Sequence, residues 1–286
     1  MIPGRALLYL GVFCGGFVAV SLWSFWLVIQ PQQIRTGRTP DDFRLPAKDV
    51  MLTASDGVSL AAWFIPEKNN DAGKRAIIFL HGYPADKSDM LDMAAGLHHD
   101  YGLLLMDLRS FGDSSGGYTT LGIRERDDVK KALDFLQARG YERIGIFGFS
   151  LGGAIAMLAA EDDSRISALV TYGALADFRR LGYETYDKLL FLKYPLVYFM
   201  ELWARLLFGA WLSDHAPALA AQNLQIPLLL AHSREDEQIS FSHFERLRGE
   251  LAQNPRAEFF IIERGIHGEL PPEFNDRVRI FWEQEL

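Results

Sequence analysis

The sequence has little of what several classes of protein require. Its 286 residues hold a single cysteine, Cys14, in an N-terminal apolar run, so the rest of the chain has no disulfide, cysteine nucleophile or thiolate metal ligand. The net charge is −8 without a basic stripe, which argues against a nucleic-acid partner. No H-x-x-E-H or C-x-x-C pattern and no Rossmann glycine fingerprint occurs, so neither a metal nor a cofactor is predicted.

Apolar residues are abundant. The hydrophobic fraction is 49% and the aromatic fraction is 13%, enough for a sizeable core and against global disorder. The length suits one large domain or a domain with an insertion.

The N-terminal segment is predicted to anchor the chain in a membrane. Residues 6–29 carry no charge, and a bilayer core takes about 20 helical residues. A cleavable signal peptide has an apolar core of only about 7–15 residues. We therefore predict a single-pass anchor over 1–30 and a linker over 31–48, with a chain starting near Thr39 expected to be soluble and active. Lysine and arginine counts favour a cytoplasmic catalytic side, but the short N-terminal tail fits the opposite topology too, so the side is left open.

The most informative motif is Gly148-Phe149-Ser150-Leu151-Gly152-Gly153. The apolar run 143–147 precedes it as a predicted strand, and 154–160 follows as a predicted helix. Strand, sharp turn and helix are the context in which G-x-S-x-G forms a nucleophile elbow. Ser150 is therefore the predicted nucleophile, and the alternative is a glycine-rich turn with a bystander serine.

The rest of the chain alternates between the two kinds of element, which predicts a mostly parallel sheet covered by helices on both faces. Asp56-Gly57 marks a hairpin, and strands are expected at 50–53, 60–65, 76–80, 102–106, 143–147, 166–172, 227–231 and 258–262. Helices are expected at 90–99, 124–139 and 272–285. No strand is evident over about 176–224, which predicts a helical cap within a domain at 49–286; the alternative is ordinary crossover helices.

A serine nucleophile needs a histidine base and an orienting acid, in the order serine, acid, histidine on such a sheet. Asp236 and His267 each follow a predicted strand end by a few residues and are the predicted acid and base. Glu235 and Glu237 compete with Asp236. His232 also lies at a strand end, but it precedes the acid and is interpreted as structural.

The oxyanion hole needs two amide donors. We predict Leu151, at the start of the helix after the elbow, and Tyr83, in the loop after the strand that ends at His81-Gly82. His81 is interpreted as bracing that loop. Ser150 Oγ is expected within about 3–3.5 Å of a His267 nitrogen.

Together these residues resemble the alpha/beta-hydrolase superfamily over about 50–286. The likeness rests on His81-Gly82, the turn at 107–116, the elbow, Asp236 and His267. In relatives a glycine is usual where this chain has Ser110, and another where it has Ser233. The stretch 122–129 resembles bacterial serine hydrolases of the esterase, lysophospholipase and S9-like peptidase groups.

The resemblance implies a serine hydrolase of carboxylic esters, and the membrane segment favours lipid or acyl-chain esters. The alternatives are an S9-like peptidase or acyl-protein thioesterase with the same triad, and a non-catalytic binding protein on the same fold. The cap is expected to bind an acyl group or to pack on the domain below through its aromatic residues, which are Tyr194, Tyr198, Phe199, Trp203, Phe208 and Trp211.

Overall fold

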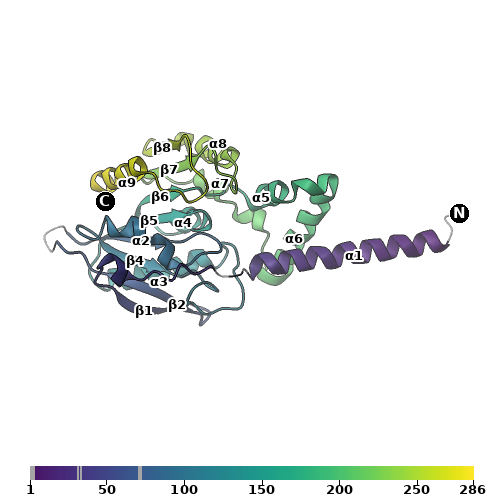
Figure 1. The fold of residues 1–286 in the computed structure, drawn as a ribbon, viewed down its shortest axis with the longest axis horizontal. Helices are drawn as coiled ribbons and strands as arrows, with labels where there is room; N and C mark the ends of the chain where they lie inside the picture. The colour runs from purple at the N-terminus through teal and green to yellow at the C-terminus, as the bar shows by residue number, and fades with distance from the viewer. Residues whose placement is uncertain (1–3, 31, 33, 70–72) are drawn as a thin grey trace.

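An eight-stranded sheet forms the centre of the domain in the computed structural model, which describes residues 4–30, 32, 34–69 and 73–286 (Figure 1). The strand order is β1-β2-β4-β3-β5-β6-β7-β8, with β3 to β8 parallel and β2 antiparallel to both neighbours. The strands are β1 (Lys48–Thr53), β2 (Ser59–Ile65), β3 (Arg75–Leu80), β4 (Gly102–Met106), β5 (Arg143–Phe149), β6 (Ile166–Tyr172), β7 (Leu228–Ser233) and β8 (Ala257–Ile262). The predicted mostly parallel sheet is confirmed.

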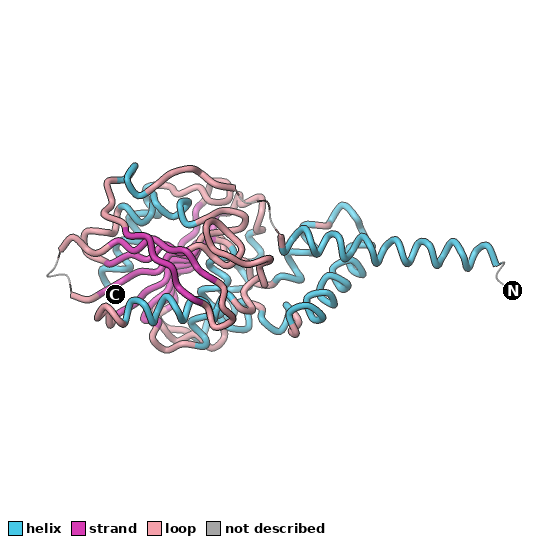
Figure 2. The backbone as a smooth tube through the Cα atoms, turned by 90° about the horizontal axis from the view of Figure 1, so that it is seen from below, coloured by secondary structure: helices cyan, strands magenta, loops and turns pink. Residues whose placement is uncertain are grey.

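Each face of the sheet carries its own apolar core. Ile78 and Leu80 of β3 pack with one core, whereas Ile77 and Phe79 pack with the other, as the two-residue period of a strand requires. The first core also holds side chains of α3 (Glu125–Gln137), α4 (Leu151–Asp162) and α8 (Phe241–Glu250), and the second those of α2 (Leu91–Ala95) and α9 (Pro272–Glu285). Figure 2 shows the twisted strands between these helical layers.

The expected helix at 90–99 is shorter in the structure. A 3₁₀ turn, η2 (Lys87–Met90), leads into α2, which ends at its C-cap Gly96. Glycine is about 1 kcal/mol less favourable than alanine within a helix, so it marks the end there.

Helices fill the chain between β6 and β7, as predicted for 176–224. They are α5 (Phe178–Thr185), η3 (Asp187–Leu192), α6 (Lys193–Phe208), η4 (Leu212–His215) and α7 (Pro217–Ala221). α5 and α6 lie beyond the sheet, with α6 beside the N-terminal helix and α5 packed on α6 (Figure 1). α7 instead packs against α4 and α8, with Ala218 and Ala221 in the core.

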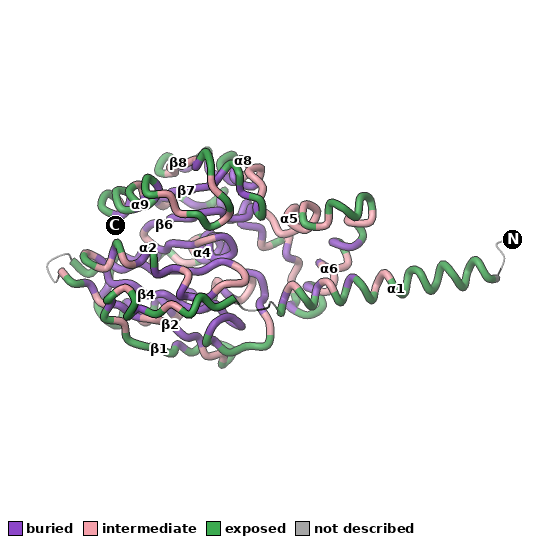
Figure 3. The backbone as a smooth tube through the Cα atoms, in the orientation of Figure 1, coloured by how far each residue is buried: buried purple, intermediate pink, exposed green. Residues whose placement is uncertain are grey.

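The N-terminal helix α1 (Gly4–Ile29) projects away from the sheet as a long arm (Figure 1). Within the described residues, Arg5–Ile29 is long and apolar enough to cross a bilayer. Its outer half is exposed (Figure 3), while Phe25 and Ile29 are buried against the domain. The C-terminal end of α1 is fixed to a surface loop, because Thr119 N donates to Ile29 O at 2.9 Å and Gln30 Nε2 to Gly117 O at 2.8 Å.

The described part of the predicted linker lies against the domain. Ile34 N donates to Pro84 O at 3.1 Å, and Thr36 Oγ1 lies 2.6 Å from Ser88 Oγ. A 3₁₀ turn, η1 (Pro40–Phe43), follows, and the Leu45 side chain is buried in the second core. These contacts connect α1 to the loop after β3.

Candidate active site

Ser150 lies in the turn between β5 and α4. Its backbone has φ 53° and ψ −115°, a region that residues with a Cβ rarely occupy. The turn is held by a hydrogen bond from Ser150 N to Tyr172 O at 2.8 Å. This strained turn is the feature expected of a nucleophile elbow, and it places the hydroxyl at the N-terminus of α4.

Two glycines allow this turn to form. A Cβ on Gly152 would lie 2.2 Å from Leu80 O, and one on Gly148 would lie 2.5 Å from Gly152 O. Both distances are far inside van der Waals contact with backbone atoms. The G-x-S-x-G spacing therefore follows from the close packing of β3, β5 and α4 at this point.

Asp236 and His267 lie side by side at the ends of β7 and β8. His267 Nδ1 is 2.6 Å from Asp236 Oδ2, and the side chains are 5% and 0% exposed. The other oxygen, Asp236 Oδ1, accepts from Ile239 N at 2.8 Å and Gln238 N at 3.0 Å. Burial raises the pKa of the Asp236 carboxyl, but these hydrogen bonds, with that from His267 the strongest, outweigh burial and hold the pKa below its usual value.

Neither competing acid bonds to the ring of His267, whose partner is Asp236. Glu235 and Glu237 are exposed, and Glu237 Oε2 accepts from the backbone N–H of His267 at 3.0 Å. Ser233 Oγ donates to Gly265 O at 2.5 Å and ties the acid loop to the histidine loop. This second tie was not foreseen from the sequence, where Ser233 is noticeable only as a replacement for glycine.

Phe149 connects Ser150 with His267 in space. The ring of His267 packs on that of Phe149, with centroids 4.8 Å apart, and Phe149 directly precedes Ser150. The expected hydrogen bond between Ser150 Oγ and His267 is not formed among the described residues. Catalytic hydrogen bonds are often long in enzymes without substrate, so the Ser150–His267 contact stays a prediction.

The predicted oxyanion donors flank Ser150. Leu151 is the first residue of α4, where an amide has no partner within the helix. Tyr83 follows Gly82, and a Cβ on Gly82 would lie 3.2 Å from Ser150 Cβ, so this loop passes directly over the elbow. An anion beside Ser150 would therefore meet the N-terminus of α4 on one side and the loop of Tyr83 on the other.

His81 braces that loop from below. His81 is fully buried, and burial lowers its pKa below the usual value. Its Nε2 accepts from Leu108 N at 3.0 Å, which leaves the proton on Nδ1 to be donated to Gly82 O at 2.8 Å. The neutral ring thus joins the chain ends of β3 and β4 and holds Gly82 in place for Tyr83.

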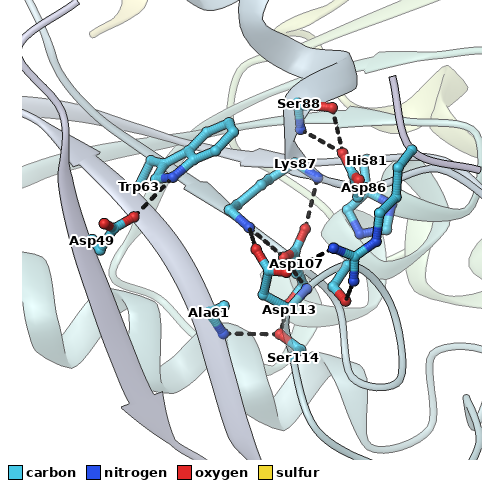
Figure 4. Close-up of polar contacts among 12 residues, drawn as sticks. Asp49, Ala61, Trp63, His81, Asp86, Lys87, Ser88, Asp107, Asp113 and Ser114 are labelled. Atoms are coloured by element: carbon cyan, nitrogen blue, oxygen red, sulfur yellow. Dashed lines mark hydrogen bonds and ion pairs between the residues drawn. The ribbon is translucent and has the colours of Figure 1, made fainter. Parts of the chain in front are cut away.

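An ion-pair network around the buried Lys87 supports the same loop (Figure 4). Lys87 Nζ lies 2.6 Å from Asp107 Oδ2 and 2.8 Å from Asp113 Oδ2, and it sits 4.7 Å from the ring of Trp63. Burial lowers the pKa of Lys87, but the two carboxylates outweigh burial and raise it above its usual value. The sequence indicated Asp107 through the turn at 107–116, but nothing in the pattern pointed to Lys87.

A cavity of about 820 Å³ extends from Ser150 to the N-terminal helix. Ser150, Tyr83 and Asp236 line one end. Phe25 and Val28 of α1 line it too, together with apolar residues of the cap. These cap residues include Val197 and Met200 of α6 and Phe178 and Leu181 of α5. Leu175, just before the cap, lines the cavity as well.

The cap aromatics expected to form an acyl site lie elsewhere. Phe199 packs edge-on against Phe17 of α1, and Trp203 Nε1 donates to Ser21 Oγ at 3.0 Å. Tyr194 and Tyr198 are exposed. Of the aromatic residues predicted for the acyl site, Phe199 and Trp203 therefore contact α1, while Val197 and Met200 of the same helix line the cavity.

The cavity wall also has a charged part. Glu201 of α6 is buried and accepts from Arg179 Nε at 2.9 Å. Glu184 Oε2 lies 3.2 Å from Nε2 of the buried His243. The cavity thus combines an apolar region beside α1 with a polar region beside α5. Among the described residues, no three histidine, cysteine or acidic side chains form a group that could hold a metal ion.

The fold and the strained turn at Ser150 are those of a class of hydrolases. A comparison with known protein families supports this assignment. Residues 75–222 match the model of the alpha/beta hydrolase fold. The chain belongs to that family.

Particular relatives are similar along most of the chain. The protein YfhR of Escherichia coli O157:H7 is 27% identical over 242 residues, which cover 81% of this chain and 76% of YfhR. Among solved structures, an esterase of Pyrococcus furiosus superposes with a TM-score of 0.73 at 24% identity, covering 90% of this chain and 98% of that one. A bacterial membrane phospholipase A superposes with a TM-score of 0.61 at 19% identity and covers 98% of this chain and 97% of its own. At these identities the solved structures establish the fold.

Proposed function

We propose that this chain is a membrane-anchored serine hydrolase that cleaves carboxylic esters of acyl chains. The observation that carries the proposal is the buried Asp236–His267 pair beside a cavity that leads from Ser150 to apolar residues of α1. The similarity to an esterase and to a membrane phospholipase A supports it as a likeness of fold.

In the proposed mechanism, Ser150 Oγ attacks the ester carbonyl carbon while His267 Nε2 takes the hydroxyl proton. Asp236 accepts from Nδ1–H and stabilises the imidazolium that forms. The amides of Leu151 and Tyr83 hold the negative oxygen of the tetrahedral intermediate. When the intermediate collapses, the C–O bond to the leaving alcohol breaks and His267 gives that alcohol its proton.

The acyl group is then bound to Ser150. His267 takes a proton from a water molecule, which attacks the acyl carbonyl carbon. Collapse of the second intermediate returns the proton to Ser150 Oγ and releases the carboxylic acid. An acyl chain of the substrate would lie along Val197 and Met200 towards Phe25 and Val28, which are apolar, while the polar region beside α5 would face the alcohol part.

A labelling experiment tests the enzyme class. A fluorophosphonate should label the full chain in detergent and should not label Ser150→Ala, whereas Ser240→Ala, another serine of the cavity wall, should label like the wild type. Equal labelling of Ser150→Ala would contradict the nucleophile. Absence of labelling in the wild type would favour a non-catalytic protein on this fold.

A substrate panel tests the chemistry. p-Nitrophenyl esters of increasing chain length, acyl thioesters and peptide anilides should be compared at equal concentration. We expect ester turnover that rises with chain length over several carbons and then levels off. Preferred turnover of anilides or thioesters would instead favour the peptidase or thioesterase alternatives, which use the same three residues.

A fractionation experiment tests the anchor. The full chain should sediment with membranes and resist extraction by alkaline carbonate, because a helix such as Arg5–Ile29 inserted across a bilayer leaves it only with detergent. Recovery of the full chain in the soluble fraction without detergent would overturn the membrane assignment.

A further inference from the structure

The cap has an exposed apolar edge whose position relative to α1 points to a second membrane contact. We define the cap edge as Leu189, Leu190, Phe191, Tyr194 and Tyr198. Phe191 and Leu190 are 73% and 71% exposed, and Tyr194 and Tyr198 are more than half exposed. Exposed side chains of this size gathered in one place mark an interaction surface.

The cap edge belongs to one side of the cap. Residues 191, 194 and 198 are separated by three and four positions, so they share a face where the chain is helical. Leu190 has φ 52° and ψ −123°, a left-handed conformation that is strained for leucine and interrupts η3. The kink at Leu190 separates Leu189 from Phe191, Tyr194 and Tyr198, which follow it and continue into α6.

α6 runs beside α1 in the same direction. Phe199 contacts Phe17 with centroids 6.3 Å apart, Trp203 bonds to Ser21, and Phe208 contacts Phe25 at 5.7 Å. The cap edge precedes Phe199 in the chain, so it lies at or beyond the level of Phe17 along α1. Figure 1 shows α6 beside the inner part of the arm.

The length of α1 then sets the depth of the cap edge. From Arg5 to Phe17 a helix rises only about 18 Å at 1.5 Å per residue, whereas the hydrocarbon core is about 30 Å thick. A bilayer crossed by α1 must therefore extend past Phe17 towards Trp23. The part of α6 that contacts Phe17 then lies at the depth of the acyl chains, inside the headgroup layer.

We propose that the cap edge inserts into the membrane leaflet next to the catalytic domain and that its partner is the lipid bilayer itself. Charged residues near the cap edge limit the depth to which the edge inserts into the leaflet. Asp187 pairs with Lys193 at 2.5 Å, and the exposed Lys188 has an aliphatic stem that lets its ammonium reach the headgroups. The edge thus lies in the outer acyl region, as interfacial amphipathic elements do.

This insertion gives the cavity a direct supply of substrate, a consequence that rests on the proposed function. Val197 and Met200 of the same helix line the cavity, as do Phe25 and Val28 of α1. With α1 and the cap edge in the membrane, an acyl chain can pass from the leaflet to Ser150 along these apolar side chains.

The depth experiment uses the single native cysteine as its reference. Cys14 is exposed on the outer half of α1, so an environment-sensitive fluorophore on it reports the bilayer interior. In a Cys14→Ser background, the same label is placed by Phe191→Cys, by Tyr194→Cys and by Met51→Cys, an exposed position on β1. The full chains are reconstituted in vesicles of phosphatidylethanolamine and phosphatidylglycerol and quenched by nitroxide lipids or by aqueous iodide.

We expect lipid quenching at 191 and 194 to exceed that at 51 by at least about twofold, with the opposite order for iodide. If iodide quenches the labels at 191 and 194 as strongly as the label at 51, the proposal is overturned. The anchor is still upheld in that case if the nitroxide lipids quench the label on Cys14. Shielding from both quenchers would assign the edge to a protein contact and also overturn it. A Cys14 label quenched by iodide would overturn the anchor and the cap insertion together.

An activity measurement in the native background completes the test. Phe191→Gln with Tyr194→Gln should lower turnover of a long-chain ester presented in vesicles by about fivefold or more, because less apolar surface enters the leaflet. Turnover of a soluble acetyl ester should stay unchanged. Met51→Gln, the matched exposed control, should alter neither; equal losses on both substrates would overturn the proposed role of the edge.

Discussion

His267 donates its Nδ1 proton to Asp236 Oδ2 across 2.6 Å, in a pair that is almost fully shielded from water. The depressed pKa of Asp236 keeps its carboxyl ionised as the acceptor. With Nδ1 protonated, the neutral ring has its lone pair on Nε2, which is the nitrogen that a serine hydroxyl needs as a base.

Asp236→Asn is expected to lower ester turnover by about ten-thousand-fold, because an amide can donate to Nδ1 and so favour the wrong tautomer. The matched controls are the flanking acids. Glu235→Gln should be neutral, and Glu237→Gln should cost little, since the exposed Glu237 accepts from the backbone N–H of His267 and from Gln238 Nε2, and a glutamine oxygen can still accept from that N–H. Steady-state kinetics decides, and a larger loss in either glutamate variant than in Asp236→Asn would reassign the acid.

Ser150→Gly is expected to abolish turnover and yet give a more stable protein than Ser150→Ala. Alanine keeps the Cβ that is strained at φ 53° and ψ −115°, whereas glycine adopts this region freely. The difference in free energy of unfolding should be about 1 kcal/mol after the greater chain entropy of glycine is subtracted. Thermal unfolding of the two inactive variants measures it; a less stable glycine variant would show that the turn is not strained.

The sheet, the strained turn at Ser150 and the pairing of Asp236 with His267 were predictable because each depends on local signals. Buried strands appear as apolar runs, and the close approach of β3 to Gly152 leaves only glycine possible there. Asp236 and His267 follow strand ends, and parallel strands bring their carboxyl ends to one edge. The pairing of these residues thus follows from topology once the strands are known.

The cavity wall was not predictable in the same way. Phe25 and Val28 lie in an apolar helix whose composition indicates only a membrane, and no local signal shows that part of it packs on a domain. In α6 the aromatic residues attract attention, but Phe199 and Trp203 contact α1 while Val197 and Met200 face the cavity. Which face of an apolar helix meets which neighbour depends on long-range packing, and so does the pairing of Lys87 with Asp107.

Met200→Trp is expected to shorten the preferred acyl chain. The larger side chain fills part of the apolar cavity, and since such pockets discriminate by about 1–3 kcal/mol per methylene, turnover of long-chain esters should fall by about tenfold or more. Acetyl ester turnover should change little. Leu206→Trp is the matched control, because Leu206 lies on the same helix but is 67% exposed. A uniform loss across chain lengths in Met200→Trp would point to destabilisation and against an acyl site.

Acid is expected to destabilise the domain through three buried histidines. Burial lowers the pKa of His81, His232 and His243 from the usual 6.5. The unfolded chain then binds protons more readily than the folded one, so this stability is complete above about pH 6.5 and is lost as the pH falls below it. Each group contributes a slope of up to about 1.4 kcal/mol per pH unit.

His243→Asn tests the contribution of one of them. Ala176 N donates to His243 Nδ1 at 2.9 Å, and an asparagine oxygen can accept that bond without titrating. The slope of unfolding free energy against pH between 7 and about 5.5 should fall by about a third. Denaturant unfolding in detergent at several pH values measures this slope, and an unchanged slope would mean that His243 is already protonated in the folded state.

Removal of α1 is expected to change the active site as well as the location of the protein. A chain starting at Thr39 lacks Phe25 and Ile29, which are 2% and 0% exposed, and burial of two such side chains contributes roughly 3–6 kcal/mol. We expect its melting temperature to fall by roughly 10 °C and its dependence on acyl length to flatten, while an acetyl ester is still cleaved. In the full chain, Phe25→Ala should reproduce the flattened profile, and Leu27→Ala, on an exposed side of the same turn, should not. A truncated chain with the melting temperature and acyl-length profile of the full one would show that α1 is an anchor alone and no part of the cavity.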